Sequence, residues 1–152
     1  MSWFPLLLAI HVFLAVLMLL PSVVLPFVLR RTGPQASPLT RALMTMQGSG
    51  MLVIGAGLAA TGLAMLWILG PQLLAQPWLI AALSLYAVNL AVAALISRPN
   101  LRRMVGIGSS GDGTVAEASW TRLARRQRLL AYGMAGAIGV IGLLMSTKPR
   151  LW

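Results

Sequence analysis

The distribution of charged residues restricts the fold of this chain more than any other feature. Residues 1–29, 42–97 and 129–147 contain no Asp, Glu, Lys or Arg, and together they make up most of the 152 residues. The hydrocarbon of a bilayer is about 30 Å thick and is crossed by about 20 helical residues. The first and last stretches are therefore each long enough for one membrane-spanning helix, and the middle stretch is long enough for two.

Local signals set the expected helix ends. The middle stretch divides at GPQLLAQP, residues 70–77, because glycine and proline end one helix and begin the next. Ser37 followed by Pro38, and the capping box formed by Thr114 and Glu117, both indicate helix starts. We expect helices at about 3–29, 38–69, 78–97 and 115–146. Alternation of apolar and polar residues with period two is missing, so the sequence predicts an all-α, polytopic four-helix bundle formed by a single domain, 1–152.

Arginine and lysine positions predict how the helices are threaded. Basic residues in short connections stay on the cytoplasmic side. Connections 30–43 and 98–128 hold ten arginines and should be cytoplasmic: Arg30, Arg31, Arg41, Arg98, Arg102, Arg103, Arg122, Arg125, Arg126 and Arg128. Connection 70–77 has none and should lie outside. We expect spans at about 3–29, 44–69, 78–97 and 129–146 in a bacterial inner membrane, with both termini outward and the second and fourth helices extended on the cytoplasmic side.

The net charge of +10 does not point to nucleic acid, because arginines at the ends of apolar spans are topology signals and contacts for anionic lipids. GIGSSG, residues 106–111, matches a dinucleotide-binding pattern, but that pattern needs a preceding strand and an acidic residue about 20 positions later. Here it follows a membrane span and position 131 is Ala. We therefore interpret it as a flexible tether. The chain has no cysteine for a disulfide or a thiolate metal site.

Small residues predict which helices touch. They let neighbouring backbones approach closely within a membrane. The fourth helix carries glycine at every third position and the second helix offers a matching seam, so we expect these two helices to pack together; a groove for a flat cofactor is the alternative. The residues are Gly133, Gly136, Gly139 and Gly142 in the fourth helix, and Gly48, Gly55, Ala59 and Gly62 in the second.

The only histidine, His11, lies within the apolar run LLLAIHVFLAVLMLLP. An imidazole in hydrocarbon needs a hydrogen-bond partner, so it should face the bundle interior. Counting residues inward from the outer ends of the helices places Thr61, Tyr86 and Asn89 within reach. We expect these four residues to form a polar cluster that fixes the packing. The alternative is that His11 ligates a b-type haem or a metal ion.

Methionines are candidates for a second ligand. Met65 and Met134 lie about one turn from the expected level of His11, and Met44, Met46 and Met51 lie near the inner end of the second helix, where thioethers would suit Cu(I). Methionine also fills apolar gaps, which is the simpler explanation.

Several short motifs carry a family resemblance over nearly the whole chain. They are the single His of the first span, ATG in the second, SRPN closing the third, WTRLARRQRLL before the fourth, and MSTKP at the end. This ordering resembles small bacterial predicted integral membrane proteins of unknown function, relatives of the copper-resistance-D-like and haem-pathway four-helix membrane proteins. The resemblance implies an inner-membrane bundle, and b-type haem or copper in the better-studied relatives. It extends to His11, Thr61, Gly62, Pro99, Lys148 and Pro149.

The chain departs from the haem-binding relatives because it has no second histidine. A bis-histidine haem within one chain is therefore excluded, which leaves His with Met, a five-coordinate iron, or a ligand from another subunit. Asp112 and Glu117 are the only carboxylates, and no nucleophile has an evident base, so we expect no enzymatic activity. The two functional hypotheses are a non-catalytic bundle that assembles with itself or a larger membrane complex, and a haem- or copper-binding protein that uses His11.

Overall fold

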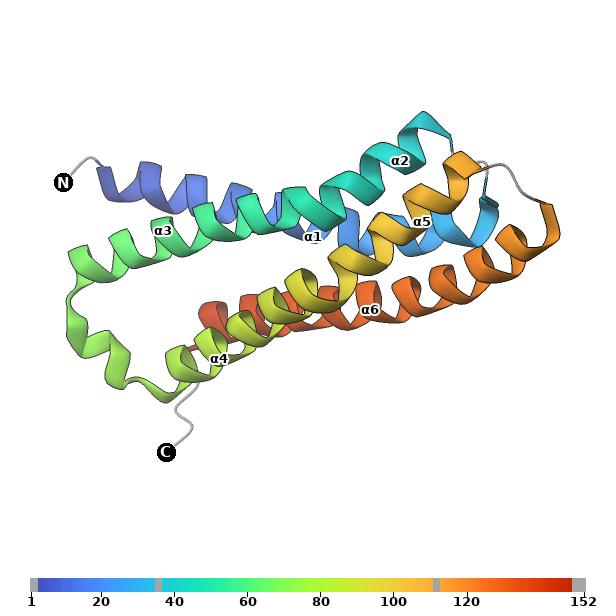
Figure 1. The fold of residues 1–152 in the computed structure, drawn as a ribbon. Coiled ribbons are helices and arrows are strands. Elements are labelled where there is room, and N and C mark those ends of the chain that lie inside the picture. The colour runs from blue at the N-terminus through green and yellow to red at the C-terminus, as the bar shows by residue number, and fades with distance from the viewer. Residues whose placement is uncertain (1–2, 35–36, 111–112, 149–152) are drawn as a thin grey trace.

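The computed structural model describes residues 3–34, 37–110 and 113–148, and the regular structure within these ranges is entirely helical. The chain forms four long rods joined by short connections (Figure 1). The first rod is α1 (Trp3–Arg31), the second is α2 (Pro38–Thr45), η1 (Met46–Gly50) and α3 (Met51–Leu69), and the short η2 (Pro71–Ala75) follows. The third is α4 (Pro77–Val92), η3 (Ala93–Ser97) and α5 (Arg98–Ser110), and the fourth is α6 (Gly113–Thr147).

Each rod is long and apolar enough to cross a membrane. The candidate spans are Trp3–Arg31, Pro38–Leu69, Pro77–Ile107 and Val115–Thr147. Large apolar side chains cover their outer faces, as at Val53, Trp67 and Leu95, which are 73%, 88% and 75% exposed. Contact with lipid is the environment that such a surface needs. The all-α four-helix prediction is confirmed.

The second rod begins as the sequence indicates. Pro38 is its first helical residue, and the Ser37 side chain accepts a hydrogen bond from the backbone N–H of Thr40 at 3.3 Å. The cap therefore satisfies one of the donors that the first helical turn leaves free. For α6 the helix begins at Gly113, one residue before the expected cap Thr114, whose side chain lies outside the described residues.

The predicted end of the third helix at 97 is wrong. A π-helical turn, η3, ends at Ser97, and the helix continues through Pro99 as α5 to Ser110. Proline lacks an N–H and its ring needs space in the preceding turn, and a widened π turn supplies that space. The third rod therefore extends beyond its apolar stretch like the second and fourth. Residues 106–110 are helical, so the flexible-tether interpretation of this segment is also wrong; Gly111 lies outside the described residues.

The expected pairing of the second and fourth helices is wrong as well. In the bundle α1 packs against both α3 and α6, and α4 and α5 pack against α6, whereas the second rod meets α6 mainly at Met134, beside Gln47 and Met51. A Cβ atom placed on Gly133, Gly136, Gly139 or Gly142 would meet nothing within 4 Å. Because α1 lies between α3 and α6, the glycines of α6 face away from the described helices. In the second rod Ala59 is likewise exposed.

The glycines of the second rod pack against the first and third rods instead. A Cβ at Gly48 would contact Leu101, one at Gly55 would meet the Leu90 side chain at 2.9 Å, and one at Gly62 would meet His11. The seam in the second rod therefore does permit close helix contact, but with different partners from those expected.

Tight packing is concentrated at one end of the molecule. We call this the basic end: it comprises the end of α1, α2, α5 and the first half of α6, and it carries the ten arginines. A buried apolar cluster fills it, and the Trp120 indole donates to the backbone carbonyl of Thr32 at 3.2 Å. The cluster consists of Leu25, Leu29, Met44, Leu101, Met104, Trp120 and Ala124.

A layer of buried amides and hydroxyls lies next to this cluster and links the rods in two pairs, the first to the second and the third to the fourth. Gln47 in η1 donates to the Ser22 hydroxyl on α1 at 3.2 Å. Gln127 on α6 donates to the Ser97 hydroxyl at 2.8 Å and accepts from the Asn100 amide at 3.0 Å. Both glutamines are fully buried. We call these five residues, Ser22, Gln47, Ser97, Asn100 and Gln127, the amide layer.

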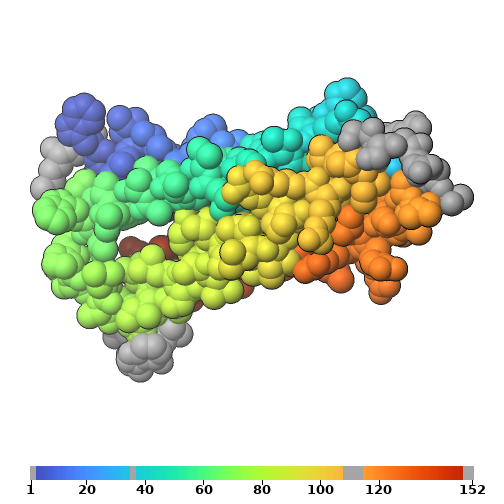
Figure 2. Space-filling view, viewed as in Figure 1, coloured from blue at the N-terminus to red at the C-terminus, as the bar shows by residue number. Residues whose placement is uncertain are grey.

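The rods separate toward the opposite end, which we call the open end: the start of α1, η2 and the last turns of α6. There α3 and α4 diverge (Figure 1). The space-filling view shows the hollow between them, through which atoms of α6 are visible (Figure 2). The molecule is thus held together at the basic end and open at the other.

The amide layer predicts the outcome of removing one amide. Gln127→Leu keeps a similar volume but leaves Ser97 and Asn100 without their side-chain partner. Leaving buried polar groups unsatisfied costs about 1–3 kcal/mol, so the free energy of unfolding, measured by SDS titration in mixed micelles, should fall by that amount. Arg125→Leu, at an exposed position of the same helix, is the control. Equal stability of the two variants would refute the role of the layer.

Candidate functional site

His11 forms one hydrogen bond across the open half of the bundle. Its Nδ1 atom lies 2.8 Å from the Thr61 hydroxyl on α3. The Thr61 Oγ1 atom also lies 3.0 Å from the carbonyl oxygens of Gly57 and Leu58, one turn earlier in the same helix. The ATG segment at 60–62 therefore places its hydroxyl against the only imidazole of the chain.

The Thr61 contacts bear on which ring nitrogen carries the proton. A threonine hydroxyl has one proton to donate, and a backbone carbonyl can only accept it. When a carbonyl of Gly57 or Leu58 takes this proton, the hydroxyl oxygen accepts from a protonated Nδ1 of His11, and the neutral imidazole keeps its lone pair on Nε2.

Gly62 makes room for the ring. A Cβ atom at this position would lie 3.3 Å from Cε1 and 3.9 Å from Nδ1 of His11. The imidazole therefore rests against the backbone of α3, and even a methyl group at residue 62 would push it away.

His11 lies on the interior face of α1 but is only partly covered. It is seven and fourteen residues from Met18 and Leu25, so the three side chains share one face of the helix. Met18 and Leu25 are 1% and 0% exposed, whereas His11 is half-buried. The interior loses its cover at His11 because the rods have separated at this level.

Tyr86 and Asn89 do not join His11. The Tyr86 hydroxyl donates to the Gly55 carbonyl at 2.5 Å, about 9 Å along α3 from Thr61 at 1.5 Å per residue. Asn89 is 3% exposed, and its side-chain nitrogen has no hydrogen-bond partner among the described residues. The four residues expected to form one cluster are thus divided into the His11–Thr61 pair and two separate groups on α4.

The two candidate methionine ligands occupy different levels. Met134 is buried with Met18 and Met51 around the Gln47 amide, whose nitrogen lies 4.0 Å from the Met134 sulfur. Met18 is seven residues from His11, which is about 10 Å along α1, so the expected closeness of Met134 to His11 is wrong. The α6 helix is therefore displaced along its axis from the position expected by counting residues inward from the helix ends. Met65 is partly buried one turn beyond Thr61 on α3.

The methionines near the inner end of the second helix do not form one group. Met44 belongs to the buried apolar cluster of the basic end, whereas Met51 lies with Met18 and Met134. The Gln47 nitrogen is 3.8 Å from the Met51 sulfur. The Met51 and Met134 sulfur atoms therefore face an N–H donor, which is the arrangement of a packed core.

No group of three or more His, Cys, Asp or Glu side chains that could hold a metal ion occurs within the described ranges. The chemistry available at His11 is therefore that of a single imidazole that is hydrogen-bonded to Thr61 in an apolar, partly open interior. Such a group can ligate the iron of a planar cofactor or serve as one member of a larger ligand set.

The amide layer was not anticipated from the sequence. A signal was present, because Gln47 lies within a charge-free stretch and Gln127 lies among arginines at the end of another. Amides in such positions are expensive unless they are hydrogen-bonded inside the bundle.

Comparison with known proteins identifies the family. No curated protein and no solved structure matches the chain. A family described as "Predicted integral membrane protein (DUF2269)" matches residues 5–149. The match supports the expected integral-membrane family and does not extend to the copper-resistance-D-like proteins. With four apolar helices and a match over nearly its whole length, the chain belongs to the DUF2269 family of predicted integral membrane proteins.

Proposed function

We propose that this protein is a non-catalytic, cofactor-binding membrane protein that holds its cofactor in the open half of the bundle through His11. The observation that carries the proposal is the hydrogen bond between Nδ1 of the half-buried His11 and Thr61, which would leave the Nε2 lone pair for a ligand. Ligating histidines ordinarily donate their other ring N–H to a nearby acceptor, which sets both tautomer and orientation. Thr61 supplies that acceptor here.

A b-type haem is the cofactor that this arrangement suits best. A single protein ligand is sufficient for five-coordinate iron, and Met65 or a residue of another subunit could complete six-coordination. The haem would supply redox chemistry or diatomic-ligand binding, and the chain would contribute the axial imidazole and an apolar surrounding.

We also propose that the bundle has the membrane orientation that the arginines predict. With the basic end in the cytoplasm of a bacterial cell, the open end and both termini face the periplasm. The His11 site would then lie in the outer half of the inner membrane.

Haem binding can be measured by titrating the detergent-solubilised protein with hemin and following the Soret band. The wild type should show a shifted, saturable Soret band, and His11→Gly should lose it and regain it on addition of imidazole. Thr61→Val, which removes only the acceptor for Nδ1, should weaken binding about 10–100-fold.

Met134→Leu is the matched control, because the Met134 sulfur lies with Met18 and Met51 and away from His11. Its Soret band should equal that of the wild type. Hemin binding that is the same in His11→Gly and in the wild type, or a wild type that leaves the free-hemin spectrum unchanged, would contradict the proposal.

A second candidate function is assembly with another copy or with a larger membrane complex, and the outer face of α6 favours it. Gly133, Gly136, Gly139 and Gly142 face open space, and Leu129 and Leu143 beside them are 67% and 62% exposed. A row of glycines between large apolar side chains lets a second helix approach closely.

Mass measured by light scattering in detergent tests this candidate. The wild type should form an oligomer that the pair Gly136→Leu and Gly139→Leu dissociates. The pair Ala59→Leu and Ala60→Leu on the exposed face of α3 should leave it intact. A wild type that stays monomeric at every protein-to-detergent ratio would refute self-assembly.

A further inference from the structure

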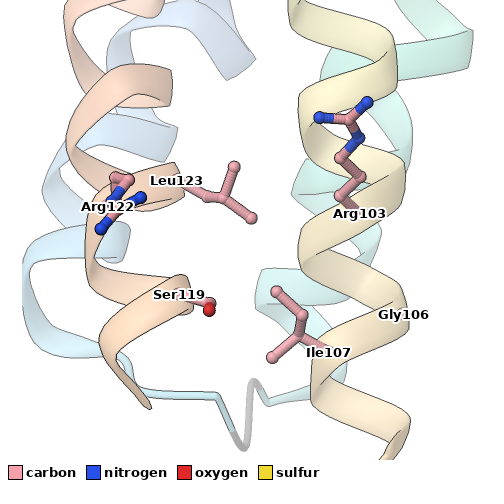
Figure 3. Close-up of a pocket in the computed structure, with 6 residues that line it drawn as sticks. All are labelled: Arg103, Gly106, Ile107, Ser119, Arg122 and Leu123. Carbon is pink, nitrogen blue, oxygen red and sulfur yellow. The ribbon is translucent and has the colours of Figure 1, made fainter. Parts of the chain in front are cut away.

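Two arginines and a serine line a pocket at the basic end that the His11 site does not involve. The pocket has a volume of about 480 Å³ and lies between α5 and α6. It is lined by Arg103, Gly106, Ile107, Ser119, Arg122 and Leu123. We call it the basic pocket. Ile107, Ser119 and Leu123 project into the space between the two helices, and the arginines stand on either side of it (Figure 3).

The charges of the basic pocket have no carboxylate partner within the described residues. Arg103 and Arg122 are both exposed, and no carboxylate in that part of the chain pairs with either of them. The Ser119 hydroxyl has no hydrogen-bond partner in the part of the chain that the structure describes. The pocket therefore offers two guanidinium groups and a hydroxyl donor to an anion, and its lining side chains include no carboxylate.

The pocket walls are held in place. The α5 and α6 helices pack against each other, and Leu101, Met104 and Trp120 from these helices are buried in the apolar cluster of the basic end. The Asn100 amide on α5 also donates to the Leu123 carbonyl on α6 at 3.2 Å. The packing beneath them thus fixes the backbone positions from which the Arg103 and Arg122 side chains extend, which prepares the site for its ligand.

The position of the basic pocket along the bundle axis indicates that the anion comes from the lipid headgroup layer. Arg103 is six residues beyond Ser97, and Arg122 is seven residues before Leu129, the ends of two charge-free stretches. Both lie about 9–10 Å beyond those ends at 1.5 Å per residue. The headgroup layer occupies about the first 5–7 Å outside the hydrocarbon, and arginine side chains extend far enough to reach back to it.

The apolar lining points to the same source. Ile107 and Leu123 are partly buried between the arginines. A hydrated inorganic phosphate gains nothing from such a surface, whereas the glycerol and upper acyl carbons of a phospholipid would cover it. We propose that the basic pocket is a binding site for the headgroup phosphate of an anionic phospholipid, with Arg103 and Arg122 on the phosphate oxygens and Ser119 as an additional donor.

Native mass spectrometry of the full-length protein, delipidated in detergent and titrated with dioleoylphosphatidylglycerol, tests the site. The wild type should retain this lipid, and the pair Arg103→Gln and Arg122→Gln should weaken its binding about tenfold or more, because two charge-assisted contacts are lost. Gly106→Leu should weaken binding without changing any charge. A Cβ at Gly106 would meet nothing within 4 Å, so the larger side chain can fill the pocket without disturbing the helix.

The pair Arg41→Gln and Arg125→Gln removes the same charge from exposed positions that do not line the pocket. It should weaken binding clearly less than the pocket pair. Equal losses in the two pairs would show diffuse attraction only and overturn the site. Glycerol 3-phosphate that competes as strongly as the lipid, or dioleoylphosphatidylcholine that is retained equally well, would overturn the assignment to an anionic lipid.

Discussion

The buried amide layer is the interaction on which the rest of the bundle depends. Lipid tails are as apolar as the helices, so apolar contact alone gives little reason for helices to associate in a membrane, whereas hydrogen bonds between them do. Gln47 links the second rod to the first through Ser22, and Gln127 links the fourth rod to the third through Ser97 and Asn100. The π turns η1 and η3 contain Gln47 and Ser97, so both turns lie in this layer. The apolar cluster of the basic end lies next to the layer.

Because the rods are joined at the amide layer, they can separate toward the open end. Beyond the contact of Gly55 with Tyr86 and Leu90, α3 and α4 diverge (Figure 1), and the interior face of α1 changes from fully buried at Met18 to half-covered at His11. An open, apolar interior inside a membrane must contain something, whether lipid chains, a second protein or a cofactor. The half-covered imidazole of His11, held by Thr61, is the feature that favours a cofactor.

The sequence predicts what depends on local composition and misses what depends on contacts between rods. Charge-free stretches determine the number of helices, and Ser37 with Pro38 determines a helix start, since both act through neighbouring residues. Pro99 was expected to end a helix, but the helix continues because the π turn η3, which ends two residues before it, accommodates the proline ring. Whether Gly133 contacts another helix, and where Met134 lies along the bundle, depends on how the rods are arranged and displaced along their axes. The His11–Thr61 contact could be anticipated by counting residues from helix ends, whereas Tyr86 and Asn89 could not be placed that way.

The central claim, a bundle fixed at its basic end and open at the other, can be measured by double electron–electron resonance in lipid nanodiscs, because the chain has no native cysteine to interfere with spin labels. Labels at Leu39 and Val105 report on the basic end, and labels at Leu63 and Ile80 report on the open end; all four positions are exposed. The account predicts a narrow distance distribution for the first pair and a broad one for the second, which hemin narrows only when His11 is present. Equally narrow distributions at both ends, unchanged by hemin, would contradict it.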